Sequence, residues 1–193
     1  SGLVKVEHSF LENKLKKYLN SSIFLLPLDE ITMEIRENNW IKSVNLSTNY
    51  RDTLFVSLEE YKPLGIYSFN DRKFYFDNKG KIIDEVKIDL SDYKNFIVFY
   101  GKSSNLKAKI IIDLLNSLNF QKKFNIKSIH YIEKRRWDIL LNNNTKLMLS
   151  ENSPKKSLQN FINIEKNLSK ADINNIKRLD LRNTKKTLIT YNK

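Results

Sequence analysis

The spacing of apolar residues changes abruptly at about residue 40, and this change limits the folds open to the first third of the chain. Before it, apolar residues recur at helical spacing and predict two short helices, 9–19 and 28–38. After it, apolar and polar residues alternate over 44–46 and 54–58, on either side of a turn at 49–52. Two helices followed by a hairpin indicate a small α+β unit.

Local signals predict where these helices begin. Ser9 followed by Glu12 fits a capping box, and Pro27 stands just before the second helix. We expect the second helix to bury Ile31 and Ile35. The buried stripe of the first helix is predicted to be Leu11, Leu15, Tyr18 and Leu19. A strand over 3–6 would precede the first helix.

Pro63 begins a longer, strand-rich segment, so we divide the chain into domains 1–62 and 63–193. Helices are predicted over 105–118, with Leu106, Ile110, Leu114 and Leu118 as its apolar stripe, and from Ser153 to about Leu168. The predicted strands are 64–67, 73–76, 81–83, 96–100, 126–132, 137–141, 146–149, 176–181 and 187–191. The fold class is therefore α+β throughout.

Composition excludes some functions and leaves others open. The 193 residues carry a net charge of +12 and no cysteine, which rules out disulfides and thiol chemistry. Because the lysines are scattered along the sequence, a solvated basic surface is favoured over a polyanion-binding site. Trp137, which follows Arg135 and Arg136, is interpreted as a core residue rather than a base-stacking one. No apolar stretch is long enough to span a bilayer.

No catalytic, cofactor or metal site is predicted. His8 and His130 are isolated, without the spacing of metal ligands. Glu59 and Glu60 are neighbours on a predicted strand and would point to opposite faces. The four glycines form no phosphate-binding loop. We therefore interpret the protein as non-enzymatic.

Three blocks, taken in order, resemble the FtsQ/DivIB family of bacterial cell-division proteins. The first runs from Trp40 to Pro63, with Asn39 where the family usually has proline. The second is Arg135-Arg136-Trp137 with its hairpin partner, and the third is the Asp-Leu-Arg signature at 180–182. The second and third are more similar to the Gram-negative FtsQ branch than to DivIB.

This resemblance implies an architecture and a location. A short cytoplasmic tail and one transmembrane helix, absent from this sequence, would anchor the chain in the inner membrane at the division septum. Outside that membrane would follow a POTRA domain of order β-α-α-β-β, its first strand truncated here. A β-domain, an extended antiparallel sheet with two flanking helices, would complete the periplasmic region.

The resemblance also implies a role as a divisome scaffold that needs no cofactor. Family members link early and late division proteins, and their β-domain binds the FtsB–FtsL pair when FtsB adds a strand to the sheet edge. Further divisome proteins could bind the POTRA domain. On this chain the predicted partner-binding residues are Arg182, Thr184, Lys185, Lys186, Thr187, Leu188, Ile189, Thr190 and Tyr191.

Other interpretations remain open at this point. Asn183 stands where the family would have an aromatic residue, and the last strand could be an edge without a partner. A POTRA-type chaperone or assembly factor of an outer-membrane or secretion system is an alternative. A basic nucleic-acid-binding module is another, although we expect no nucleic-acid ligand.

Overall fold

The computed structural model describes residues 5–86, 96–169, 173 and 175–192. The chain divides into two compact units, Ser1–Lys62 and Pro63–Lys193. We describe each unit separately. No helix among the described residues is long and apolar enough to cross a membrane.

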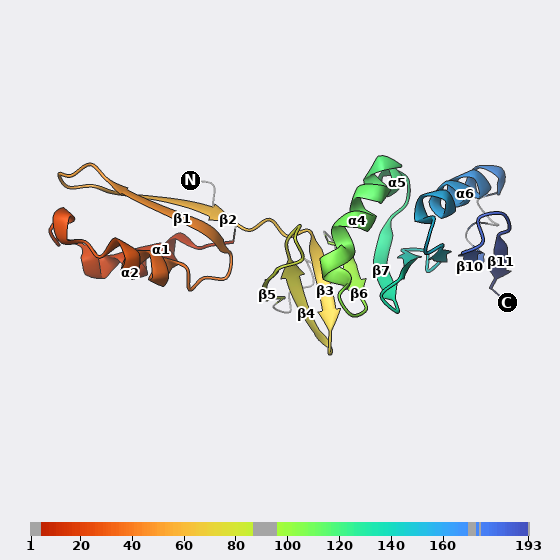
Figure 1. The fold of residues 1–193 in the computed structure, drawn as a ribbon, viewed down its shortest axis with the longest axis horizontal. Coiled ribbons are helices and arrows are strands. Elements are labelled where there is room, and N and C mark those ends of the chain that lie inside the picture. The colour runs from red at the N-terminus through yellow and green to blue at the C-terminus, as the bar shows by residue number, and fades with distance from the viewer. Residues whose placement is uncertain (1–4, 87–95, 170–172, 174, 193) are drawn as a thin grey trace. The chain divides into compact units, whose positions relative to one another are not determined.

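The first unit consists of two helices followed by a two-stranded antiparallel hairpin (Figure 1). Its elements are α1 (His8–Leu15), the 3₁₀ turns η1 (Lys16–Tyr18) and η2 (Ile23–Leu25), α2 (Leu28–Ile35), β1 (Ile41–Thr48) and β2 (Leu54–Glu60). The helix–helix–hairpin order predicted from apolar spacing is confirmed.

The first helix differs from its prediction. Glu7 occupies the N-cap position, and Ser9 lies inside the helix, where its hydroxyl donates to Glu7 Oε2 at 3.0 Å. The expected capping box is therefore wrong. Leu19 lies beyond the helix and is 68% exposed, so it does not belong to a buried stripe.

The core of this unit forms where α2 packs on the hairpin. Ile31 and Ile35, one turn apart on α2, are both buried, as the sequence predicted. Trp40 and Ile41 are buried where β1 begins. The hairpin turn is fixed by Asn49, whose Oδ1 accepts hydrogen bonds from the next backbone N–H groups at 51–53.

The strand expected over 3–6 lies partly outside the described residues. Lys5 and Val6 are not in a strand, yet both are attached to the end of β2. The backbone N–H groups of Lys5 and Val6 donate to Glu60 Oε1 at 3.0 Å and 2.7 Å. Val6 is buried.

The second unit is a nine-stranded sheet in the order β11-β10-β9-β8-β7-β6-β3-β4-β5. Its strands are β3 (Gly65–Phe69), β4 (Arg72–Phe76), β5 (Ile82–Glu85), β6 (Val98–Tyr100), β7 (Ile126–Ile132), β8 (Arg136–Leu141), β9 (Lys146–Leu149), β10 (Ile176–Leu181) and β11 (Leu188–Tyr191). Its helices are α4 (Ser104–Ser117), α5 (Phe120–Lys123) and α6 (Pro154–Asn167).

The sheet is mixed, so the expectation of an antiparallel sheet is wrong in this respect. The pairs β6–β7, β9–β10 and β3–β6 are parallel. In the first two cases a helical segment connects the paired strands: α4 and α5 join β6 to β7, and α6 joins β9 to β10. Such a crossover returns the chain to the same end of the sheet, and the next strand therefore runs parallel.

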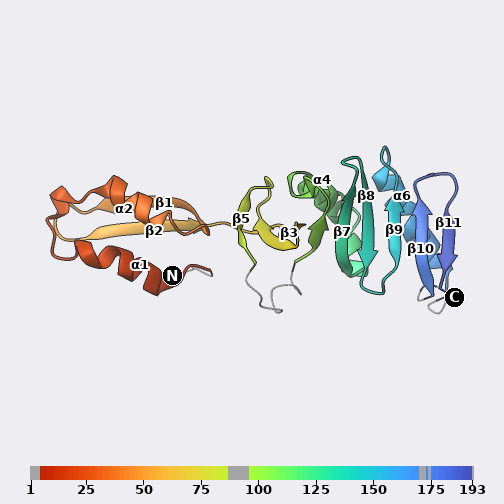
Figure 2. The same ribbon diagram turned by 90° about the horizontal axis from the view of Figure 1, so that it is seen from below.

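All three helices cover one face of the sheet, and the other face carries no described helix (Figures 1 and 2). One apolar core lies between the layers, and it includes Trp137, as expected. Within it the ring of Phe99 meets Phe76 and Trp137 edge-on, with centroids 5.4 and 6.4 Å away.

The apolar stripe predicted for α4 lies only in part against the core, where Leu114 and Leu118 pack half-buried. Leu106 and Ile110 are 59% and 63% exposed. The helix instead buries Ala108, Ile111, Ile112 and Leu115.

Candidate partner-binding edge

The predicted partner-binding residues gather at one end of the nine-stranded sheet. Arg182 follows β10 directly, and β11 lies beside β10 as the last strand in the sheet order (Figure 2). The two strands pair antiparallel, with Leu179 opposite Ile189 and Asp180 opposite Leu188.

Two buried hydroxyls hold β10 in place. Thr145 Oγ1, in the turn before β9, donates to the carbonyl of Ile176 at 2.9 Å. Ser157 Oγ, in the first turns of α6, donates to the carbonyl of Leu181 at 2.8 Å and accepts from Ser150 N–H at 3.0 Å. Both ends of β10 are therefore fixed, because each bond is made by a fully or nearly buried side chain.

Arg182 is oriented by its neighbour Asp180. The Arg182 Nε donates to Asp180 Oδ1 at 2.9 Å, and Nη2 donates to Oδ2 at 2.5 Å. These bonds lower the pKa of the Asp180 carboxyl, so the pair stays ionised well into the acidic range. Half of the Arg182 side chain stays exposed, which leaves its Nη1 hydrogens available to another acceptor.

The strand after Arg182 is shorter than predicted. Thr184 and Lys185 lie in a turn, and Lys186 and Thr187 connect it to β11. Asn183 closes the turn, because its Oδ1 accepts from Lys185 N–H at 2.9 Å. The Thr184 carbonyl accepts from Asn160 Nδ2 of α6 at 3.0 Å, which attaches the turn to the helical side.

Only Leu188 to Tyr191 form the edge strand itself. Ile189 packs against the core. Leu188 and Tyr191 are 55% and 44% exposed. Beside them, Asp180, Arg182, Asn183, Lys186 and Leu188 line an open hollow of about 300 Å³.

A polar row that sequence reasoning missed crosses the uncovered face of the sheet and ends at this edge. Residues paired directly across neighbouring strands share a face, and the pairs link Tyr100, His130, Asp138, Met148, Asp180 and Leu188 in one line. These residues come from six strands, so no local pattern in the sequence could have identified the row.

Asp138 is the buried charge in this row. It is 1% exposed and lies between Arg136, whose Nε is 3.4 Å from Oδ1, and Lys146, whose Nζ is 3.0 Å from Oδ2. The contact with Lys146 is an ion pair without the alignment of a hydrogen bond. Two cations thus compensate the carboxylate, as a buried charge requires.

Ser128 and His130 come close to a catalytic arrangement without forming one. Ser128 Oγ lies 2.9 Å from His130 Nε2, and the His130 ring stacks on Tyr100 at 4.7 Å. Asp138, the strand neighbour of His130, directs its carboxylate at cations instead of orienting the imidazole. Burial lowers the pKa of His130, which favours the neutral ring.

Metal-binding clusters of histidine and carboxylate side chains are also absent from the described part of the chain. The two histidines lie in different units, His8 on α1 and His130 on β7. The site thus consists of the edge strand β11, the oriented side chain of Arg182, and the exposed apolar residues Leu188 and Tyr191.

Comparison with known proteins decides the family. Residues 67–182 match the family model "Cell division protein FtsQ/DivIB, C-terminal", and residues 1–61 match "POTRA domain, FtsQ-type". The chain belongs to the FtsQ/DivIB family. The resemblance seen in the sequence blocks is confirmed.

Individual relatives agree with the family models. The chain is 27% identical over 192 residues to the cell division protein FtsQ of Rickettsia felis, covering 97% of this chain and 70% of the relative. The FtsQ of Rickettsia bellii is 28% identical over 193 residues, with the same coverage. The FtsQ of Neisseria gonorrhoeae is 23% identical over 180 residues, covering 93% and 72%.

Family membership has several consequences. The protein takes part in cell division, and it is not an enzyme, since the family consists of non-enzymatic divisome proteins. Its fold is a POTRA domain followed by a large, mostly β sheet with flanking helices. The assembly-factor alternative loses its support, because the second unit matches the FtsQ/DivIB C-terminal model and not a further POTRA repeat. That match ends at Arg182, so β11 lies beyond it.

Proposed function

We propose that this protein is a divisome scaffold that links early and late division proteins by binding an FtsB–FtsL pair through strand addition at β11. The observation that carries the proposal is the position of β11. It pairs with β10 on one side, and it is the last strand of the described sheet on the other. An edge strand offers backbone N–H and C=O groups that a partner strand satisfies.

Arg182 supplies the specific contact in this proposal. Half of its side chain is exposed beside the hollow, while Asp180 holds the guanidinium in place through Nε and Nη2. A carboxylate of the partner would complete the hydrogen bonding of an arginine that is already oriented. Preorganisation of this kind reduces the entropy lost on binding.

Apolar contacts would supply the remaining affinity. Leu188 and Tyr191 expose large apolar surfaces at the same edge. A partner strand would cover them when it pairs with β11, and aromatic residues such as tyrosine often anchor interfaces. Lys185 and Lys186 would guard the uncovered edge against self-pairing and attract an acidic partner.

The same proposal assigns domains and location. Residues 1–62 form the POTRA domain, which could receive further divisome proteins, and residues 63–193 form the β-domain. A helix preceding the present sequence anchors the protein in the inner membrane, with both domains in the periplasm at the septum. Family membership supports this assignment.

The experiment is a titration of the chain with a peptide from the extracytoplasmic end of the cognate FtsB-like protein. Arg182→Glu should weaken binding by at least about tenfold, since a charge-assisted contact is replaced by repulsion. Arg51→Glu is the matched control, because Arg51 is exposed in the hairpin turn of the other unit. It makes the same change in net charge away from the edge.

Two further variants test strand addition itself. Thr187→Pro and deletion of 188–193 should abolish peptide binding, while circular dichroism verifies that the rest of the sheet stays folded. Full binding by these variants would show that the edge is the wrong site. Failure of the unmodified chain to bind any FtsB–FtsL segment would reject the partner as well.

A further inference from the structure

The outer surface of the helical layer, which we define as α4, α5 and α6, is strongly and unevenly charged. Its exposed lysines are Lys107, Lys109, Lys122, Lys123, Lys155, Lys156 and Lys166. The three helices contain two acidic residues, Asp113 and Glu165. Some of the lysines that are scattered in the sequence thus lie together on these helices, whereas others, such as Lys127, Lys134 and Lys177, lie outside them.

Most of these charges are uncompensated. Lys109 pairs with Asp113, with Nζ 2.8 Å from Oδ2. Among the described residues, the six other lysines of the layer have no carboxylate within ion-pair distance. On the uncovered face of the sheet, by comparison, Arg136 and Lys146 are paired with the buried Asp138, and Arg182 is paired with Asp180. With seven lysines and two carboxylates, the helical layer carries a net charge of +5, most of it without an ion-pair partner among the described residues.

The layer also carries exposed aliphatic residues. Leu106 and Ile110, one turn apart on α4, point away from the core and are more than half exposed. Lys107 and Lys109 lie between them in the sequence and flank them on the helix. Large aliphatic side chains among lysines form an amphipathic surface, which differs from a surface of charged side chains that contacts only water.

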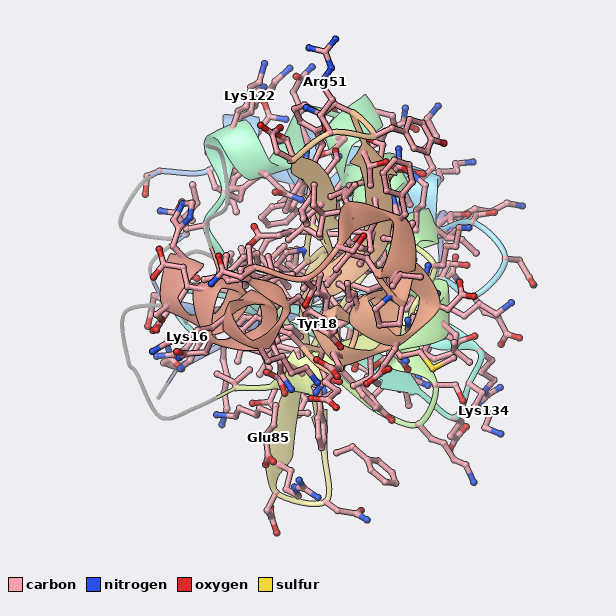
Figure 3. The ribbon with its side chains drawn as sticks, turned by 90° about the vertical axis from the view of Figure 1, so that its left-hand side faces the viewer. Lys16, Tyr18, Arg51, Glu85, Lys122 and Lys134 are labelled. Atoms are coloured by element: carbon pink, nitrogen blue, oxygen red, sulfur yellow. The ribbon has the colours of Figure 1, made fainter. Side chains whose placement is uncertain are left out.

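The helices form one continuous surface. Phe120, which begins α5, and Phe124, which follows it, contact Phe161 of α6 with ring centroids 5.8 and 5.0 Å away. Both α4 and α6 pack on the same core. Figure 3 shows the Lys122 side chain pointing outward from this layer, whereas Lys134 points outward on a different side.

We propose that the helical layer rests on a lipid bilayer that contains anionic phospholipids. The lysine ammonium groups contact headgroup phosphates, and Leu106 and Ile110 insert between the headgroups. Each lysine near an anionic surface adds to the attraction, and buried aliphatic area adds to it independently. The chemistry argues against nucleic acid, because the three helices contain no arginine and their aromatic side chains, Phe120 and Phe161, are buried.

Vesicle flotation tests this proposal with the full 193-residue chain. The chain should float with vesicles that contain phosphatidylglycerol and stay at the bottom with vesicles of phosphatidylcholine alone. The triple variant Lys107→Glu, Lys122→Glu and Lys156→Glu should bind the anionic vesicles at least roughly 100-fold more weakly, since three attractive charges are replaced by repulsive ones. Raising the salt concentration should weaken binding of the unmodified chain.

A matched control separates this surface from net charge. The triple variant Lys16→Glu, Lys62→Glu and Lys134→Glu makes the same charge change on exposed lysines outside the layer. It should keep most of the vesicle binding. An equal loss in both triple variants would overturn the proposal, because net charge alone would then explain the binding.

A second pair of changes tests insertion. Leu106→Asn with Ile110→Asn leaves every charge in place, and both residues are exposed, so the fold should persist. Binding should fall by roughly tenfold, because apolar burial is lost. No change would overturn the insertion step. Failure to bind anionic vesicles, with salt-sensitive binding to duplex DNA instead, would replace the bilayer by nucleic acid as the partner.

The proposal is independent of the partner-binding edge. The helical-layer variants should bind the FtsB-like peptide as the unmodified chain does, since β11 and Arg182 are unchanged. A variant that lost both activities would indicate misfolding, which circular dichroism detects. Loss of vesicle binding alone is the expected result.

Discussion

Ser157→Ala should destabilise the second unit by more than its small size suggests. The Ser157 side chain is fully buried and joins two segments, donating to Leu181 O at 2.8 Å and accepting from Ser150 N–H at 3.0 Å. Alanine removes the hydroxyl and leaves both backbone groups without this partner. Each buried backbone group left without a partner costs about 1–3 kcal/mol. Because Ser150 is only partly buried, water can replace part of its lost bond, and we expect the free energy of unfolding to fall by about 2–3 kcal/mol in total.

Urea unfolding followed by tryptophan fluorescence measures this effect. The chain has two tryptophans, Trp40 in the first unit and Trp137 in the second. A Trp40→Phe background therefore makes the signal report on the second unit alone. In thermal unfolding the same loss corresponds to a fall in Tm of roughly 6–12 °C for a domain of this size.

Ser117→Ala is the matched control. Ser117 Oγ donates to Leu114 O at 2.7 Å on the exposed side of α4, where water can replace the bond. Its unfolding free energy should change by less than about 0.5 kcal/mol. If Ser157→Ala were equally mild, the inference that this hydroxyl fastens the end of β10 would be refuted.

Two other changes test the described geometry. Gly101 has φ +100°, and an added Cβ would lie 2.2 Å from Tyr131 O. Gly101→Ala should therefore lower the free energy of unfolding by about 2–5 kcal/mol in the same assay. A loss below about 1 kcal/mol would contradict the contact. Burial lowers the pKa of His130 from the usual imidazole value of 6.5, so the folded state resists protonation of this ring. Stability is therefore fully present above that value and declines as pH falls below it, because the unfolded chain then binds the proton more readily. His130→Gln should flatten this part of the pH profile, whereas His8→Gln, at an exposed position, should not; identical profiles for the two variants would contradict the assignment.

Local sequence patterns predicted most helices and strands, but they could not predict which apolar face of a helix would be buried. Alternation over 44–46 and 54–58 predicted the hairpin, because one face of it is half-buried and the other exposed. In α4, by contrast, Leu106 and Ile110 form one stripe and Ala108, Ile111 and Leu115 form another. Periodicity cannot decide between two apolar stripes, since the choice depends on which one meets the sheet.

Local sequence patterns also could not predict the strand directions or the polar row, because both depend on how distant segments pack together. Whether β6 and β7 run parallel depends on how α4 and α5 pack back onto the sheet. The ion pair between Asp138 and Lys146 depends on the register of β8 and β9. Of the predicted edge residues, Arg182 could be placed from its signature, whereas the turn at 184–185 depends on hydrogen bonds from Asn183 and Asn160.

The strand order of the second unit has a consequence for how the molecule assembles. Every neighbouring pair except β3–β6 joins strands that are consecutive in the chain. Such a sheet resembles a repeat array, in which each strand is stabilised mainly by the one before it, and sequence-local contacts of this kind favour fast folding. We expect the sheet to grow strand by strand towards the C-terminus, and the end strands β11 and β5, which have one neighbour each, to exchange their amide hydrogens first. A protein strand that docks on β11 would then act as the next repeat, supplied by another chain.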